Sequence, residues 1–352
     1  ISFPQDTVCD VLVVGGGGSG GMNCGGGGGA GACIVSIGHT FSSGKYDVFV
    51  GNGGIYSNDG GVNVNYNGDD SSIVYDSTIQ FKASGGAKGG GGRNSSSDHG
   101  GCTGGSGGRD DSGVVGAFKL DENIVNGITP SSKESTNYGI FANNGGSSTN
   151  WTSGNYNTIN GAGGGGIGSI GTDSTISNSG TGGDGLYEVV INGITYNFKT
   201  YFKVTGEEDG VTNNYYIGGG GGGGGYQTSM QQIQGGKGGG GKGQDAGNAP
   251  SDTNIMNATS YGSGGGGGPA NTYLSGDGYQ GIVIIRWKKI QAPILPTAIT
   301  GTNAVSLLSP YDNEMYEYAE FNNNGSITFY KDTICDVLVV GGGGSGNIGK
   351  GG

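Results

Sequence analysis

The sequence is poor in charge, and especially in positive charge. Charged residues make up 12% of its 352 residues, about half of the share in an average soluble protein. Only 16 residues are Lys or Arg, against 28 acidic ones, and the formal net charge is −12. Proteins that bind nucleic acids or anionic membranes cluster Lys and Arg around the phosphate groups. Because the basic residues here are few and scattered, we expect neither partner.

Long apolar runs and helical patterns are missing as well. The longest apolar stretches, residues 11–14 and 282–285, are far shorter than the roughly 20 residues that a helix needs to cross a bilayer. Apolar residues do not recur at the three- and four-residue spacing of an amphipathic helix. We therefore expect no membrane span and no α-helix of useful length. The chain opens without an initiator Met or a signal peptide, and we expect both ends to be cuts through a longer polypeptide.

Glycine is what the sequence has in abundance: 88 residues, a quarter of the chain. Its runs include residues 161–171, 218–225, 235–243 and 262–268. Collagen is excluded, because the runs lack a strict Gly-X-Y period and the chain has only 7 prolines. With 32% hydrophobic residues, we expect the fold to be held substantially by hydrogen bonds of the backbone.

Ordered glycine runs need many such bonds, because a glycine loses more backbone entropy on folding than any other residue. A polyproline-II helix has three residues per turn and no internal hydrogen bonds, so its N–H and C=O groups are free to bond to neighbouring helices. We therefore expect an all-β fold with layers of polyglycine-II helices, a glycine-rich sandwich without significant α-helix. The alternative is that the runs are flexible linkers.

Segments between the glycine runs carry strand patterns. Asn192-Gly193, between the two alternating apolar runs of residues 186–204, is the strongest hairpin signal. Residues 123–160 are rich in Asn, Ser and Thr, and we expect an irregular insertion there. The expected strands are residues 11–14, 33–37, 45–50, 62–66, 73–75, 78–83 and 281–287.

One stretch occurs twice. TVCDVLVVGGGGSG at residues 7–20 returns as TICDVLVVGGGGSG at residues 333–346, a period of 326 residues from Cys9 to Cys335. We expect one period of a longer tandem polymer with three parts. Residues 1–287 form a glycine-rich β/polyglycine domain that lacks its first strand, residues 288–297 a proline-containing linker, and residues 298–352 the start of the next repeat.

The repeated stretch also contains the G-x-G-x-x-G spacing of a dinucleotide-binding loop, at Gly15, Gly17 and Gly20. That loop works by leading into a helix whose N-terminus holds a pyrophosphate. The segment that follows is almost all glycine, which costs a helix about 1 kcal/mol per residue. We therefore expect a strand that feeds a glycine layer, and no cofactor.

Five cysteines occur, at spacings that do not match paired zinc ligands. Cys24 and Cys33 flank a glycine turn and are candidates for a short disulfide; buried free thiols are the equal alternative. Cys9 and Cys335 occupy the same place in the two copies and are candidates for a contact between successive repeats.

Catalytic and metal motifs are not apparent. His39 and His99 are far apart and accompany neither a G-x-S-x-G nor an H-E-x-x-H motif, so we expect no enzyme and no metal site. Residues 240–245, GGKGQD, match the start of a calcium-binding repeat, but the copy is single. We expect this segment and the acidic pairs at residues 69–70, 110–111 and 207–209 to be solvated turns.

Four N-x-S/T sequences are candidates for N-glycosylation if the protein is secreted. They begin at Asn94, Asn150, Asn257 and Asn324, and Asn150 in the irregular insertion is the one we favour.

Three features together resemble a known family. They are DVLVVGGGGSG at residues 10–20, the glycine runs with the closing GIVIIRW at residues 281–287, and the lead-in Y-x-Y-x-x-F-x-x-x-G-x-I-x-F at residues 316–329. This combination resembles the glycine-rich domain of phage tail fibres and of giant-virus structural proteins. The resemblance covers nearly the whole period and implies a structural or receptor-binding part of a virion appendage; residues 123–160 depart from a minimal domain.

We therefore expect a non-enzymatic structural repeat of a fibre, on a virion surface or otherwise extracellular. Its partners would be adjacent repeats or subunits in a filament, and the capsid. The alternative is a receptor- or glycan-binding adhesin that recognises a cell-surface glycan through exposed aromatics such as Tyr138, Trp151 and Tyr156. Ice binding is a third possibility, but it would need a flat Thr- or Ala-bearing face that the sequence does not show.

Overall fold

The computed structural model of the chain describes most of its length and divides it into two compact units, Ile1–Lys288 (unit 1) and Lys289–Gly352 (unit 2). The described residues are 1–59, 62–91, 100–108, 118–148, 159–208, 210–226, 232–245, 253–270, 272, 274–288, 298–308, 315–328, 337 and 339. The named strands pair antiparallel, and helical turns among these residues are short: η1 (Leu120–Glu122), η3 (Phe198–Phe202) and η5 (Thr253–Met256). The expected all-β class without significant α-helix is confirmed.

The main sheet of unit 1 has the order β14-β2-β3-β9. Its strands are β14 (Ile282–Trp287), β2 (Thr7–Val14), β3 (Cys33–Phe41) and β9 (Tyr138–Phe141). The four apolar residues that end β2 are all fully buried, because β2 is central and both of its faces are covered. Pairing of β14 with β2 brings the two ends of unit 1 together, from Ile282 opposite Val14 to Trp287 opposite Cys9.

A second sheet, β1-β4-β7-β8, packs against the first through aromatic rings. It contains β1 (Ser2–Phe3), β4 (Gly44–Phe49), β7 (Ser71–Tyr75) and β8 (Thr78–Ala83). Phe41 at the end of β3 stacks on Phe3 at 5.3 Å and lies 6.1 Å from Phe81 of β8, measured between ring centroids. These rings form the side-chain core at the strand end of unit 1.

Three two-stranded hairpins complete the strands of unit 1, and one is the hairpin expected at Asn192-Gly193. They are β5 (Tyr56–Asp59) with β6 (Val62–Asn65), β10 (Glu188–Ile191) with β11 (Ile194–Asn197), and β12 (Glu207–Glu208) with β13 (Tyr215–Tyr216). Asn192 and Gly193 both have positive φ, 49° and 76°, as a tight hairpin turn requires.

The strand pattern of residues 186–204 ends earlier than expected. After β11, the Asn197 side chain accepts a hydrogen bond from the N–H of Thr200, which turns the chain into η3. This turn buries Phe198 and Phe202, which lie four residues apart, on one side. The expectation that residues 123–160 form only an irregular insertion is also wrong, since β9 pairs with β3; its four residues are too short a signal among polar neighbours.

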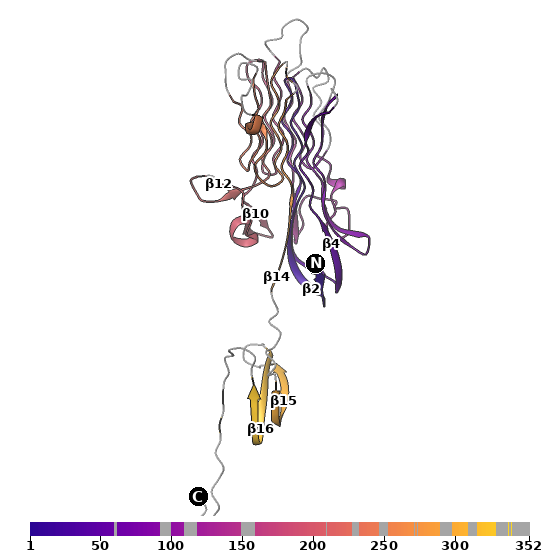
Figure 1. The fold of residues 1–352 in the computed structure, drawn as a ribbon, viewed down its shortest axis with the longest axis vertical. Helices are drawn as coiled ribbons and strands as arrows, with labels where there is room; N and C mark the ends of the chain where they lie inside the picture. Colours follow the sequence, from indigo (N-terminus) through magenta and orange to yellow (C-terminus); the bar gives the residue numbers. More distant parts are fainter. Residues whose placement is uncertain are drawn as a thin grey trace, which may run out of the picture. The chain divides into compact units, whose positions relative to one another are not determined.

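The glycine runs leave the strands as extended, buried tracts that lie side by side in unit 1 (Figure 1). Successive N–H groups of a tract donate to three neighbouring segments in turn, so every third N–H group donates to the same neighbour. The N–H groups of residues 15, 18 and 21 donate to segment 26–32, those of residues 16 and 19 to segment 66–69, and those of residues 17 and 20 to segment 276–279. The same rotation recurs along residues 26–32 and 220–225.

We call these bonded tracts the glycine lattice. It comprises residues 15–21, 25–32, 84–90, 100–108, 161–166, 180–185, 218–225, 235–243 and 262–268. The lattice requires glycine because the tracts leave no room for a side chain. A Cβ added at Gly17, Gly27 or Gly221 would lie 1.9 Å from the carbonyl oxygen of a neighbouring tract. The flexible-linker alternative does not fit these tracts, since they are buried and their amides are bonded.

The described part of unit 2 is one long hairpin of β15 (Ala298–Leu308) and β16 (Met315–Thr328). Its register shifts between Thr300 and Thr302, where the chain bulges. The proposed linker, residues 288–297, lies almost wholly outside the described residues.

Candidate functional site

The repeated sequence lies in β2, in the centre of the main sheet. Val11 pairs with Ile285 of β14 on one side and with Ser36 of β3 on the other. Because strands cover it on both sides, Val11 and Val13 are completely buried. This strand is therefore the element that closes unit 1, and its sequence is the one that recurs 326 residues later.

Asp10 is the charged residue of β2, and it connects three elements. Its carboxylate accepts a hydrogen bond from the Tyr201 hydroxyl at 2.7 Å and pairs with the Arg286 guanidinium at 2.9 Å. That guanidinium lies 4.0 Å from the centre of the Tyr201 ring. Burial, with the hydrogen bond to Asp10, raises the pKa of Tyr201 to about 12. Asp10 therefore ties β2 to η3 and β14.

The second copy of the strand is in a different environment. Val337 and Val339 correspond to Val11 and Val13, and they are 79% and 85% exposed. Val11 and Val13 are thus buried in unit 1, whereas Val337 and Val339 are exposed. Cys335 lies outside the described residues, so its contact with Cys9 stays a prediction.

The glycine motif after β2 does not form a phosphate loop. Residues 21–32, which come directly after Gly20, contain no helix, and residues 25–32 are another tract of the glycine lattice. The N–H groups of Gly15, Gly17 and Gly20 donate to the carbonyl oxygens of Ala32, Tyr279 and Gly276 at 2.9–3.0 Å. A phosphate needs free N–H groups at a helix start, and these groups are already bonded, so the dinucleotide alternative is wrong for this loop.

Of the two alternatives for Cys24 and Cys33, the disulfide is not formed in the structure. Cys33 begins β3 and packs in the main core, whereas Cys24 packs with Ile159 and Ala270 in a separate cluster. Cys33 and Cys102 are both fully buried free thiols. Burial raises the pKa of both thiols, that of Cys102 to about 12.

Other sequence candidates lie apart from one another. Tyr138 is half-buried in β9 and packs against the main core, so it is not part of an exposed aromatic patch; Trp151 and Tyr156 lie outside the described residues. His39 packs between the rings of Phe41 and Phe81, at 4.5 and 4.9 Å.

The glycosylation candidates and the second histidine are described only in part. Asn257 is half-buried, and its side chain accepts a hydrogen bond from the N–H of Asp277 at 2.9 Å. Of Asn324 the structure describes only the backbone, in β16. Asn94, Asn150 and His99 lie outside the described residues.

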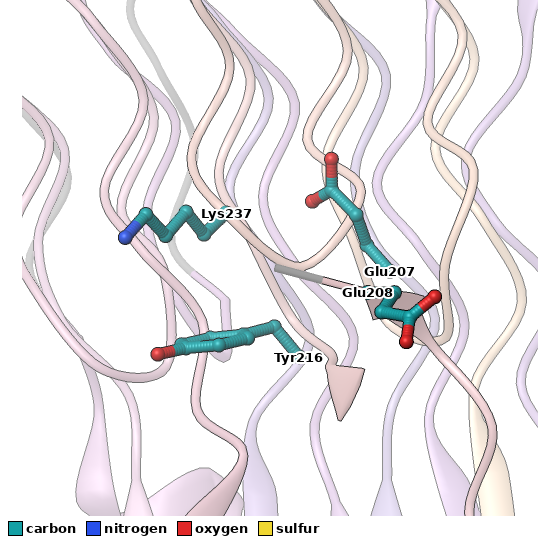
Figure 2. Close-up of a pocket in the computed structure, with 4 residues that line it drawn as sticks. All are labelled: Glu207, Glu208, Tyr216 and Lys237. Atoms are coloured by element: carbon teal, nitrogen blue, oxygen red, sulfur yellow. The ribbon is translucent and has the colours of Figure 1, made fainter. Parts of the chain in front are cut away.

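One shallow pocket of about 140 Å³ lies beside the hairpin β12–β13. Glu207, Glu208, Tyr216 and Lys237 line it (Figure 2). Figure 2 shows the Lys237 ammonium pointing away from both carboxylates. Glu207 accepts hydrogen bonds from the N–H groups of Gly238 and Gly239 at 2.6 and 2.8 Å, so it fixes a turn of the glycine lattice. These contacts give the pocket a structural explanation.

The acidic segments fall into two classes. Asp69, Asp70, Glu207 and Glu208 are exposed, but Glu207 and Glu208 form strand β12 and not the expected turn. Residues 110, 111 and 209 lie outside the described residues. Asp245, at the end of the calcium-repeat-like GGKGQD, is only 4% exposed, so a solvated turn is wrong for this residue. Within the described ranges, His, Cys, Asp and Glu side chains form no group of three or more that would hold a metal.

Comparison with known families identifies a glycine-rich domain. Residues 1–288 match the family described as a glycine-rich domain. No curated protein matches the chain. Among the residues that the structure describes, no helix has the length and apolarity to cross a bilayer.

Proposed function

The chain belongs to the glycine-rich domain family, and on that premise we propose that it is a non-enzymatic structural repeat of a virion-associated or extracellular fibre. The observation that carries the proposal is the glycine lattice: buried tracts whose hydrogen bonds rotate among three neighbours every three residues. A chain that binds a small molecule needs few such tracts, whereas in unit 1 nine of them bond to one another. The resemblance of its motifs to phage tail fibres and giant-virus structural proteins supports the location.

We assign the tracts as polyglycine-II helices. Such a helix has three residues per turn and directs its amides outward, which is the rotation that residues 15–21 follow. Each tract bonds to several others, so bending one tract breaks bonds to all of them. The lattice would thus give a rigid rod with little side-chain bulk, a property suited to a fibre.

We further propose that units are joined head to tail through the repeated strand. The support is that the sequence of β2, with Val11 and Val13 buried in the centre of the main sheet, recurs at residues 333–340, after the proposed linker. Strand pairing between units uses main-chain hydrogen bonds for affinity, and β14 already shows what partner this sequence accepts.

The joining step can be tested on the full chain by light scattering and negative-stain imaging. We expect concentration-dependent filaments with a regular axial repeat. V337D/V339D, or deletion of residues 326–340, should abolish end-to-end association, because a charge in place of a buried valine cannot enter a sheet core. The control is I170D/I176D, which places the same two charges at residues that are 66% and 65% exposed in unit 1. A chain that stays monomeric, or filaments that survive V337D/V339D, would contradict the joining proposal.

The lattice can be tested separately by amide hydrogen exchange. Because the amides of Gly18, Gly29 and Gly221 are buried and bonded, their exchange should be slower than that of Gly193 at the hairpin tip. Equally fast exchange at all four glycines would show flexible linkers and would remove the basis of the fibre proposal.

A further inference from the structure

Three oxygen atoms from distant segments meet beside Gly225, at one end of the glycine lattice. A Cβ built on Gly225 would lie 2.5 Å from Asp245 Oδ1 and 2.6 Å from both Asn160 Oδ1 and Ser179 Oγ. The Ser179 hydroxyl reaches Asp245 Oδ1 at 3.5 Å. Backbone bridges join Gly225 to both Asn160 and Asp245, so the lattice itself holds these oxygens together.

All three side chains are buried. Asn160 is 1% exposed, Asp245 4% and Ser179 7%. The Asn160 side chain is oriented by its amide nitrogen, which donates to the carbonyl oxygen of Thr175 at 2.9 Å. Its Oδ1 therefore faces Asp245, and this oxygen has no hydrogen-bond partner. A buried acceptor without a partner destabilises the fold, which indicates that something else satisfies it.

The site has more hydrogen-bond acceptors than donors. The carboxylate and the amide oxygen only accept, and the one hydroxyl can donate a single hydrogen bond. A buried carboxylate also requires a positive partner or a proton. The cluster therefore has the ligand types of a cation site: carboxylate, amide and hydroxyl oxygens that lie close together beside Gly225.

From this geometry we infer that Asp245, Asn160 and Ser179 form a calcium site. Calcium takes oxygen ligands of these kinds at about 2.3–2.6 Å, and the remaining ligands of its 6–8 are commonly backbone carbonyls and waters. A single carboxylate predicts weak binding, with a dissociation constant on the order of 0.1–1 mM, as in extracellular modules. Asp245 is the last residue of the GGKGQD segment. This segment therefore supplies one ligand to a site that the fold assembles, and it does not act as a tandem repeat.

The test is calorimetric titration of the full chain with CaCl₂ after removal of metal by a chelator, together with melting in calcium and in chelator. We expect one site and a higher melting temperature in calcium, because an ion that binds only the folded state stabilises it. Asp245→Asn keeps the shape but removes the charge, and should weaken binding at least tenfold. Gly225→Ala, which places a methyl group among the three oxygens, should do the same.

The matched control is Asp121→Asn, which removes one charge from an exposed residue of η1 and should leave binding unchanged. Circular dichroism in chelator shows whether each variant is folded, and Ser179→Ala replaces any variant that is not. Absence of calcium binding in the wild-type chain overturns the inference. So does binding that persists unchanged in Asp245→Asn, or a preference for Mg²⁺ over Ca²⁺. None of these outcomes bears on the fibre proposal, which rests on the tracts and the repeated strand.

Discussion

Replacing Gly221 with alanine distinguishes an ordered glycine lattice from a flexible glycine linker, because the two predict opposite changes in stability. Gly221 lies in the longest glycine run, and its φ is not in the left-handed region, so alanine can adopt its backbone conformation. In a flexible segment, or at any site with space, such a substitution stabilises a protein by about 0.4–1 kcal/mol by reducing the entropy of the unfolded chain. The lattice predicts the opposite.

The magnitude follows from the contacts. The new Cβ would lie 1.9 Å from the carbonyl oxygen of Gly265, and carbon–oxygen contacts require about 3.3 Å, so one tract must move by about 1.4 Å. Overpacking of this kind costs about 1–3 kcal/mol. The same oxygen accepts from the N–H of Gly28 at 2.8 Å, and Gly221 donates to the oxygen of Gly28 at 2.9 Å. Weakening both bonds adds about 2 kcal/mol, for a total of about 3–5 kcal/mol.

The assay is thermal and urea denaturation of the full chain, followed by circular dichroism. For a domain of this size the loss corresponds to a fall in melting temperature of about 10 °C. The control is Gly193→Ala at the hairpin tip, where φ is +76° and no atom lies within 4 Å of the added Cβ. It should lose only about 1 kcal/mol, from the backbone conformation. A Gly221→Ala variant as stable as the wild type would refute the lattice as the source of rigidity.

Three further predictions concern single side chains. The thiols of Cys33 and Cys102 should not react with a disulfide reagent at pH 8 until denaturant is added, since burial raises the pKa of both; rapid reaction would show that the core is open. Burial lowers the pKa of His39, so as the pH falls the unfolded chain takes up the imidazole proton before the folded chain does. Stability should therefore fall as the pH drops below about 6.5. In urea denaturation, His39→Gln should flatten this part of the curve of stability against pH. Tyr201→Phe removes the 2.7 Å hydrogen bond to Asp10 but keeps the ring under the Arg286 guanidinium. It should therefore lower the free energy of unfolding by about 1.5 kcal/mol in the same assay. An unchanged urea midpoint would mean that Asp10 is held by its ion pair alone.

Composition and local pattern were sufficient for the class of the fold. Strand patterns and the Asn192-Gly193 turn predicted most strands of unit 1 to within a few residues, because alternation and turn chemistry are local properties. The glycine runs predicted that backbone hydrogen bonds would carry much of the structure. The repeat predicted that residues 7–14 would be a structural element, and β2 is the centre of the main sheet.

Local patterns failed where the partner of a residue is distant in the chain. Cys24 and Cys33 are close in sequence, yet they pack in different clusters. The short strand β9 is held by β3, and η3 by the Asn197 cap and the burial of Phe198 and Phe202, none of which a strand pattern contains.

The sequence by itself determined that this chain is rich in β-strands, that backbone hydrogen bonds of its glycines hold much of the fold, and that residues 7–20 recur 326 residues later. These features follow from composition, alternation and self-similarity. Only the tertiary structure decided which tracts lie together. It alone placed Asp245 beside Asn160 and Ser179. The physical reason is that glycine carries no side chain that could specify its neighbour. Which tracts pair is therefore decided only when all of their backbone hydrogen bonds are formed together.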